Sequence, residues 1–154
     1  MRTAYIELNA TDQISTLTKK QGKPTFTYKG IVFYPNTPVT SLPEILHENY
    51  RYFILDMGVL NTYTTTEFLR CDKPFLVCSL SKWRYSQILE KMENLFKNQQ
   101  KQNCITLIMN LQEKGSNSLF FPELCETLSF PYISNPFQIE PRHFRALSLL
   151  IKNL

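Results

Sequence analysis

The chain has 154 residues, of which 43% are hydrophobic and 19% are charged, and its formal net charge is +4. This composition excludes an intrinsically disordered chain, and the length suits a single domain, residues 1–154, that buries a core without a metal or a disulfide. No apolar run reaches the length of a membrane span and the N-terminus has no signal-peptide core, so we expect a soluble, cytoplasmic protein with no membrane span.

The first third of the chain predicts a strand, a helix and a hairpin. Residues 3–8 are β-branched and aromatic and end in a polar segment, which is typical of a strand followed by a loop. A short helix is expected over 14–20. Two alternating runs around Gly30 then predict a β-hairpin or a bent strand over 26–34, at the edge of a sheet.

The next segment predicts a short helix and a buried strand. Ser41 precedes a proline and Glu44, a pattern that predicts a helix over 41–46 with Ser41 as its capping residue. Residues 52–56 are nearly all apolar, as in a central parallel strand buried on both faces. Asp56 ends this strand, where α/β sheets place their binding crevices.

The middle of the chain continues the alternation of helices and strands. One or two helical turns are expected over 64–69, and buried strands over 75–79 and 106–110. Between these two strands, residues 81–96 carry a continuous apolar stripe at helical spacing, which predicts the clearest helix of the chain. The sequence thus predicts that 52–56, 75–79 and 106–110 are parallel strands of one central sheet.

The last third predicts a helix over 119–128, a short strand over 130–133 and a closing amphipathic helix over 142–154. Together the elements indicate an α/β fold with three layers: a mostly parallel sheet, helices on both of its faces, and an antiparallel edge hairpin.

Residues with specialised chemistry are sparse. The four glycines are scattered, so neither of the glycine-rich phosphate-binding motifs is present, and the two histidines have no metal-ligand spacing. The four cysteines form no CxxC pair and are interpreted as buried thiols of a reducing compartment: Cys71, Cys78, Cys104 and Cys125. Lysines cluster only within 19–23 and 97–101, where a solvated surface is favoured over a phosphate-contacting patch, and no specific nucleic-acid partner is expected.

The order of the motifs resembles the part of MinD/ParA-type ATPases that lies downstream of their phosphate-binding loop. In that family a strand ends in a switch segment D-x-D-P, where this chain has Glu7 and Asn9 in the two acidic places. A second family strand ends in an aspartate that orients magnesium through water, which Asp56 resembles. A later family strand ends in an adenine-recognising asparagine, similar to Asn110, and a proline-containing loop beside the base is similar to the segment around Pro136.

Two departures from the family limit what the resemblance implies. The family's first strand, glycine-rich loop and lysines are absent from this sequence, which removes most of the binding energy for a triphosphate. Asn9 replaces the switch aspartate, and an amide cannot act as a base. We therefore expect no cofactor in the isolated chain, with ATP and magnesium bound only if a P-loop segment is supplied, and we expect no catalytic residue. The chain is either a fragment of a longer ATPase or a degenerate scaffold. It is expected to bind a protein partner or to form a homodimer.

Two other classes stay open. A receiver-like phosphoacceptor domain would use Asp56 as its acceptor, but its conserved lysine is replaced by Asn135. A structural or interaction module would present an exposed apolar patch, for which the candidates are Tyr63, Phe68, Trp83, Phe120 and Phe121.

Overall fold

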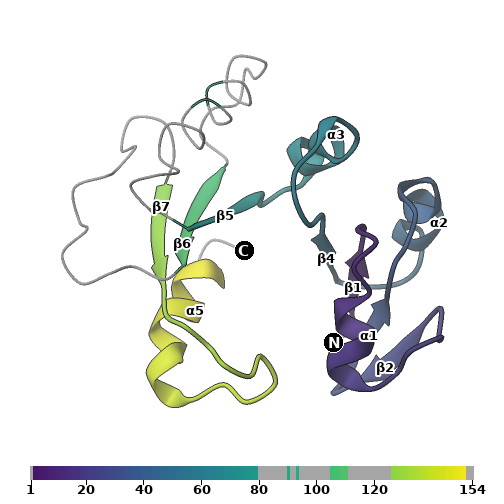
Figure 1. Cartoon of the computed structure of the whole chain (residues 1–154), viewed down its shortest axis with the longest axis horizontal. Helices are drawn as coiled ribbons and strands as arrows, with labels where there is room; N and C mark the ends of the chain where they lie inside the picture. Colours follow the sequence, from purple (N-terminus) through teal and green to yellow (C-terminus); the bar gives the residue numbers. More distant parts are fainter. Residues whose placement is uncertain (1, 80–89, 91–92, 94–104, 111–125, 152–154) are drawn as a thin grey trace. The chain divides into compact units, whose positions relative to one another are not determined.

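The computed structural model describes residues 2–79, 90, 93, 105–110 and 126–151. These residues form a mixed α/β protein, mostly with parallel strands, in two compact units, Met1–Arg70 and Cys71–Leu154 (Figure 1). The expectation of a single domain over 1–154 stays a prediction, and the two units are described separately below.

Unit 1 holds a four-stranded sheet in the order β2-β3-β1-β4. The strands are β1 (Thr3–Glu7), β2 (Phe26–Tyr28), β3 (Ile31–Tyr34) and β4 (Tyr52–Asp56). Strand β1 pairs in parallel with both β3 and β4, and β2 pairs antiparallel with β3. The edge hairpin is therefore confirmed. Its two-residue turn has positive φ at both Lys29 and Gly30, the geometry whose twist matches the flanking strands.

An aromatic row crosses one face of this sheet. The register aligns Tyr5 with Phe33 and Phe33 with Phe26, so the three rings lie on the same face of neighbouring strands. Their ring centroids are 5.4 Å apart for Tyr5–Phe33 and 5.3 Å for Phe26–Phe33. On β1 the alternate residues Ala4 and Ile6 are completely buried. Side chains from both faces of β1 thus contribute to the core of unit 1.

The helical elements of unit 1 are α1 (Gln13–Thr18), η1 (Val39–Ser41), α2 (Leu42–Leu46) and α3 (Thr62–Arg70). The predicted cap at Ser41 is wrong: this residue adopts a helical conformation at the end of η1 and makes no side-chain cap bond, because the 3₁₀ turn runs directly into α2. Helix α3 is capped instead by Asn61, whose Oδ1 accepts bonds from the N–H groups of Tyr63 and Thr64 at 2.9 and 3.1 Å.

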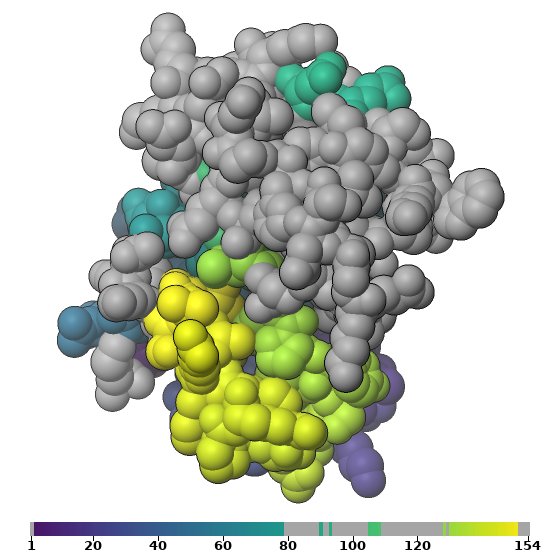
Figure 2. Space-filling model, turned by 90° about the vertical axis from the view of Figure 1, so that its left-hand side faces the viewer, coloured from purple at the N-terminus to yellow at the C-terminus, as the bar shows by residue number. Residues whose placement is uncertain are grey.

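Unit 2 holds a three-stranded parallel sheet in the order β5-β6-β7. The strands are β5 (Phe75–Ser79), β6 (Thr106–Asn110) and β7 (Glu126–Phe130), followed by η4 (Pro141–His143) and α5 (Phe144–Ile151). Buried Ile105, Leu107 and Ile108 supply its core. Figure 2 shows α5 and the segment before it, in yellow and yellow-green, at the surface, where the side chains of Tyr132, Phe144 and Leu149 are exposed.

Three sequence-based expectations need correction here. Strands 52–56, 75–79 and 106–110 all form, but the first belongs to a different sheet from the other two. Hydrophobic patterns identify strands and do not select their partners. Residues 126–128 of the predicted helix 119–128 belong to β7, and the predicted strand 130–133 ends at Phe130 because Pro131 has no N–H for the ladder.

Other expectations lie outside the described residues, wholly or in part. Of the predicted helix 81–96, only Glu90 and Glu93 are described, and both are helical. Residues 119–125 and 152–154 are not described, nor are Trp83, Phe120, Phe121, Cys104 and Cys125. Cys71 and Cys78 are half-buried. Within the described ranges, no helix combines the length and apolar character needed to cross a membrane.

Candidate functional site

Three of the five predicted site residues meet at the carboxyl edge of the sheet of unit 1. The register pairs Glu7, the last residue of β1, with Asp56, the last residue of β4. Asn9 follows β1 and donates from Nδ2 to the main-chain carbonyl of Asp56 at 3.3 Å. Because β1 and β4 are parallel, their carboxyl ends share one edge. The sequence predicts that Glu7, Asn9, Asp56 and Asn110 all lie near one edge of a single sheet, but Asn110 belongs to a strand of the second sheet.

Glu7 is the most enclosed of these residues, with only 1% of its surface exposed. Its Oε1 accepts hydrogen bonds from the N–H of Gln13 at 3.0 Å and from the hydroxyl of Thr11 at 3.3 Å. Its Oε2 accepts a bond from the N–H of Asn36 at 3.2 Å. Glu7 therefore ties the loop before α1 to the segment that follows β3, and both oxygens of its buried side chain have a protein donor.

Asp56 is half-buried and also bonds to the protein with both carboxylate oxygens. The hydroxyl of Tyr5 donates to Oδ2 at 2.5 Å, and the N–H of Gly58 donates to Oδ1 at 3.0 Å. Burial raises the pKa of Tyr5 above its usual value, and the hydrogen bond to Asp56 raises it further. Tyr5 therefore keeps its proton to a higher pH than a free tyrosine and donates it to Asp56.

The side chain of Asn9 packs closely against the turn after β4. Gly58 has φ +59°, and a Cβ at this position would lie 2.9 Å from Cβ of Asn9. The turn after β4 therefore needs glycine both for its conformation and for the close approach of Asn9. Oδ1 of Asn9 also accepts a bond from the N–H of Thr11 at 3.1 Å and lies within bonding distance of the Thr11 hydroxyl. We call Tyr5, Glu7, Asn9, Thr11, Asp56 and Gly58 the carboxyl-edge cluster.

The other two predicted site residues belong to unit 2. Asn110 ends β6 and pairs in register with Ser79 and Phe130. Pro136 is exposed in the turn after β7, where Oδ1 of Asn135 accepts a bond from the N–H of Phe137 at 3.0 Å. The structure thus brings together Glu7, Asn9 and Asp56. In the second unit, Asn110 ends strand β6 and Pro136 lies in the turn after β7.

The two carboxylates are the members of the carboxyl-edge cluster that could contact a metal ion. Among the described residues, no group of three or more His, Cys, Asp or Glu side chains could hold an ion. Both oxygens of Glu7 are buried with their protein donors. Each oxygen of Asp56 accepts one protein bond and retains capacity for a second acceptor contact. Asp56 therefore retains room for a contact to a magnesium ion, with the remaining ligands supplied by another molecule.

Sequence reasoning missed several members of the cluster. Tyr5 and Thr11 complete the hydrogen bonds of the two carboxylates, and Gly58 accommodates Asn9. The glycine directly after the strand-ending Asp56-Met57 pair was the available signal for a close backbone approach. The two described candidates for an exposed apolar patch differ in exposure: Tyr63 is 86% exposed, whereas Phe68 is buried in unit 1.

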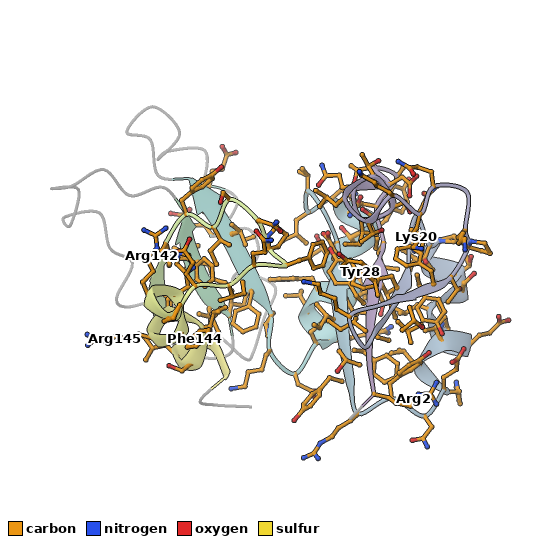
Figure 3. All side chains as sticks on the ribbon, turned by 90° about the horizontal axis from the view of Figure 1, so that it is seen from below. Arg2, Lys20, Tyr28, Arg142, Phe144 and Arg145 are labelled. Carbon is orange, nitrogen blue, oxygen red and sulfur yellow. The ribbon has the colours of Figure 1, made fainter. Side chains whose placement is uncertain are left out.

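Basic residues outside the cluster lie mainly at the surface. Figure 3 shows Lys20 in the connection between α1 and β2, and Arg142, Phe144 and Arg145 around the start of α5. At the other end of β1, the Arg2 guanidinium lies 4.8 Å from the centroid of the Tyr50 ring. Arg142 is paired with Glu140 at 2.8 Å, an exposed contact that contributes little to stability.

The fold and the cluster define a mixed α/β protein with polar residues at the carboxyl edge of parallel strands. Comparison with protein-family models, with curated proteins and with solved structures gave no match.

Proposed function

We propose that this chain is a degenerate or partial MinD/ParA-like ATPase domain, acting in the cytoplasm as a non-catalytic scaffold or regulatory binding module in partition, positioning or pilus-type assembly. The order of its motifs supports the proposal, together with the parallel pairing of β1 and β4 that places Glu7, Asn9 and Asp56 at one edge. A three-layer, P-loop-like architecture that lacks the first strand is part of the proposal.

One observation carries the non-catalytic part of the proposal: both carboxylates of the cluster are already bonded to protein donors. Glu7 has two main-chain donors and Asp56 has two donors, while the single hydroxyl proton of Thr11 lies between Glu7 and the closer Oδ1 of Asn9. A carboxylate that positions an attacking water or a metal needs lone pairs directed toward the substrate. The bonds of Glu7 instead join the loop between β1 and α1 to the segment that follows β3.

The absence of a phosphate cradle in the sequence supports the same conclusion. A triphosphate is held mainly by successive backbone N–H groups and a lysine, and this sequence has neither in a glycine-rich loop. A P-loop segment supplied from outside would provide the cradle and the phosphate oxygens that complete a magnesium shell. Asp56 would then hold the ion through water.

Calorimetry with ATP and magnesium tests this proposal on the isolated chain. We expect a dissociation constant no tighter than about 1 mM, which corresponds to about 4 kcal/mol, and no release of phosphate. Micromolar binding would contradict the proposal. In that event, a variant with Lys19, Lys20 and Lys23 changed to glutamine would show whether the basic connection supplies the missing phosphate contacts, and Asp56→Asn would show whether magnesium is involved.

A second candidate function, an interaction module without nucleotide ancestry, is favoured by the exposure of Val59 and Tyr63. Their side chains are 81% and 86% exposed in and beside the turn after β4. Joining the chain to the strand, glycine-rich loop and helix of a MinD/ParA-type ATPase distinguishes the two candidates. Ancestry predicts gain of magnesium-dependent ATP binding that Asp56→Asn weakens, whereas a pure interaction module predicts no gain.

A further inference from the structure

Strand β4 forms a lateral edge of the sheet of unit 1 and has main-chain groups available for another strand. The main-chain carbonyl of Asp56 accepts a hydrogen bond from the N–H of Leu8 at 2.7 Å, so the main-chain N–H and C=O of Asp56 point toward β1. Main-chain direction alternates along a strand, and therefore Phe53 and Leu55 direct their N–H and C=O groups away from β1. Within the described part of the chain, no strand pairs with this side of β4.

The composition of β4 is that of a central strand, not of an edge. Its sequence is Tyr-Phe-Ile-Leu-Asp, and its central residue, Ile54, is 48% exposed. Natural edge strands are usually protected by shortness, lysine, proline or a bulge. The opposite edge of the same sheet follows this rule, because β2 has only three residues and ends at the Lys29-Gly30 turn. The apolar edge of β4 has no such protection.

We propose that β4 binds an extended segment of a partner polypeptide, which adds to the sheet as a strand parallel to β4. Main-chain bonds to Phe53 and Leu55 would provide the pairing, and an apolar side chain beside Ile54 would cover its exposed surface. Parallel addition continues the order of β3, β1 and β4, which all run in one direction. This inference requires no nucleotide and stands apart from the proposed ancestry.

Charge at the two ends of β4 specifies the partner further. Exposed Arg51 precedes the strand and the Asp56 carboxylate ends it. A parallel partner strand therefore matches β4 when it begins with an acidic residue and ends with a basic one. Beyond the end of β4, exposed Val59 extends the apolar surface that the partner would contact.

Two synthetic peptides of identical composition test the proposal on the full chain. The first is Glu-Val-Ile-Val-Ile-Lys and the second is its reversal, Lys-Ile-Val-Ile-Val-Glu, both with blocked ends. At about ten times its dissociation constant, the first peptide should slow hydrogen exchange of the Phe53 and Leu55 amides about tenfold. The reversed peptide should give much less protection, because its charges oppose those of β4 in a parallel arrangement.

Matched variants separate strand addition from nonspecific binding. Ile54→Lys places a charge on the edge and should abolish protection by the first peptide, whereas Leu17→Lys, at an exposed position on α1, should leave it unchanged. Circular dichroism checks that both variants fold. Three results would overturn the proposal: no protection by either peptide at millimolar concentration, equal or stronger protection by the reversed peptide, or a homodimer of the chain alone that Ile54→Lys dissociates.

Discussion

The carboxyl edge and the lateral edge of the sheet in unit 1 meet at Asp56 and differ in how far their polar groups are satisfied. At the carboxyl edge, protein donors occupy the carboxylates of Glu7 and Asp56. At the lateral edge, Phe53 and Leu55 direct their main-chain groups away from the sheet, and Ile54 is half-exposed. At the position that usually binds ligands in an α/β sheet, the carboxylates thus bond to donors of the protein itself, whereas no described strand pairs with the outer side of β4. We call these two the closed edge and the open edge.

This difference separates stability from binding. Residues of the closed edge should affect the free energy of unfolding when they are changed, because each change removes hydrogen bonds that join separate segments of unit 1. Residues of the open edge should affect binding and leave unfolding nearly unchanged. The four predictions below follow from this contrast.

The largest effect is expected for Glu7→Ala. The change removes a buried side chain that is the shared acceptor of the N–H groups of Gln13 and Asn36, so the free energy of unfolding should fall by about 3 kcal/mol. Urea denaturation measures it. Glu44→Ala, at an exposed position in the first turn of α2, is the matched control and should cost a few tenths of a kcal/mol. A loss below about 1 kcal/mol for Glu7→Ala would show that the closed edge is not essential for folding.

Gly58→Ala should have the next largest effect. The added Cβ would lie 2.9 Å from Cβ of Asn9, and the alanine would have to adopt a positive φ. We therefore expect the free energy of unfolding to fall by about 2–3 kcal/mol. Gly22→Ala introduces the same methyl group at φ +75° with no atom within 4 Å, and it isolates the conformational cost, about 1 kcal/mol. Equal losses in the two variants would mean that the contact with Asn9 relaxes freely.

Tyr5→Phe should cost about 1 kcal/mol at neutral pH by removing the hydroxyl that donates to Asp56. Burial, and then Asp56, raise the pKa of Tyr5 in the folded protein above its unfolded value near 10.0. The associated stability is therefore complete below pH 10 and is lost as the pH rises further, since the unfolded chain releases the proton first.

Urea denaturation at pH 8 and pH 11 checks this dependence. Tyr5→Phe should lose less stability between the two values than the unchanged protein. Tyr34→Phe provides a comparison, because burial and the hydrogen bond with Tyr50 also raise the pKa of Tyr34, at a position outside the cluster. An unaltered pH dependence in Tyr5→Phe would contradict the assigned hydrogen bond.

The smallest effect on stability is expected for Ile54→Lys. Its side chain is 48% exposed on an edge strand, so the free energy of unfolding should change by no more than about 0.5–1 kcal/mol. Ala4→Lys, on the neighbouring strand β1 at a completely buried position, should prevent folding. A large loss for Ile54→Lys would show that the edge is covered within the chain.

The local elements of unit 1 could be predicted from the sequence because each has a strong pattern of its own. Alternation around Gly30 identified the hairpin, and the apolar run ending in Asp56 identified β4 with its bounds. The convergence of Glu7, Asn9 and Asp56 followed from the shared direction of parallel strands. These predictions needed only periodicity and the geometry of a sheet.

Pairing between strands and the contacts of single side chains could not be predicted. Nothing in residues 52–56 distinguishes a central strand from the edge position of β4, since hydrophobicity reports burial and not the number of strand neighbours. The helix expected over 119–128 was wrong at 126–128 because a short apolar run fits a strand and a helix equally well. The bond from Tyr5 to Asp56 joins residues 51 positions apart and leaves no local signature.

The central claim, that the carboxyl edge is closed by its own side chains, is tested most directly by NMR of the amides that bond to its carboxylates. The N–H groups of Gln13 and Asn36 donate to Glu7, and that of Gly58 donates to Asp56. Titration with magnesium-ATP to about 1 mM would fill any site of micromolar affinity. Over this range the chemical shifts of these three amides should not change. Saturating shifts of all three at micromolar nucleotide would contradict the claim and show that the edge opens to bind its ligand.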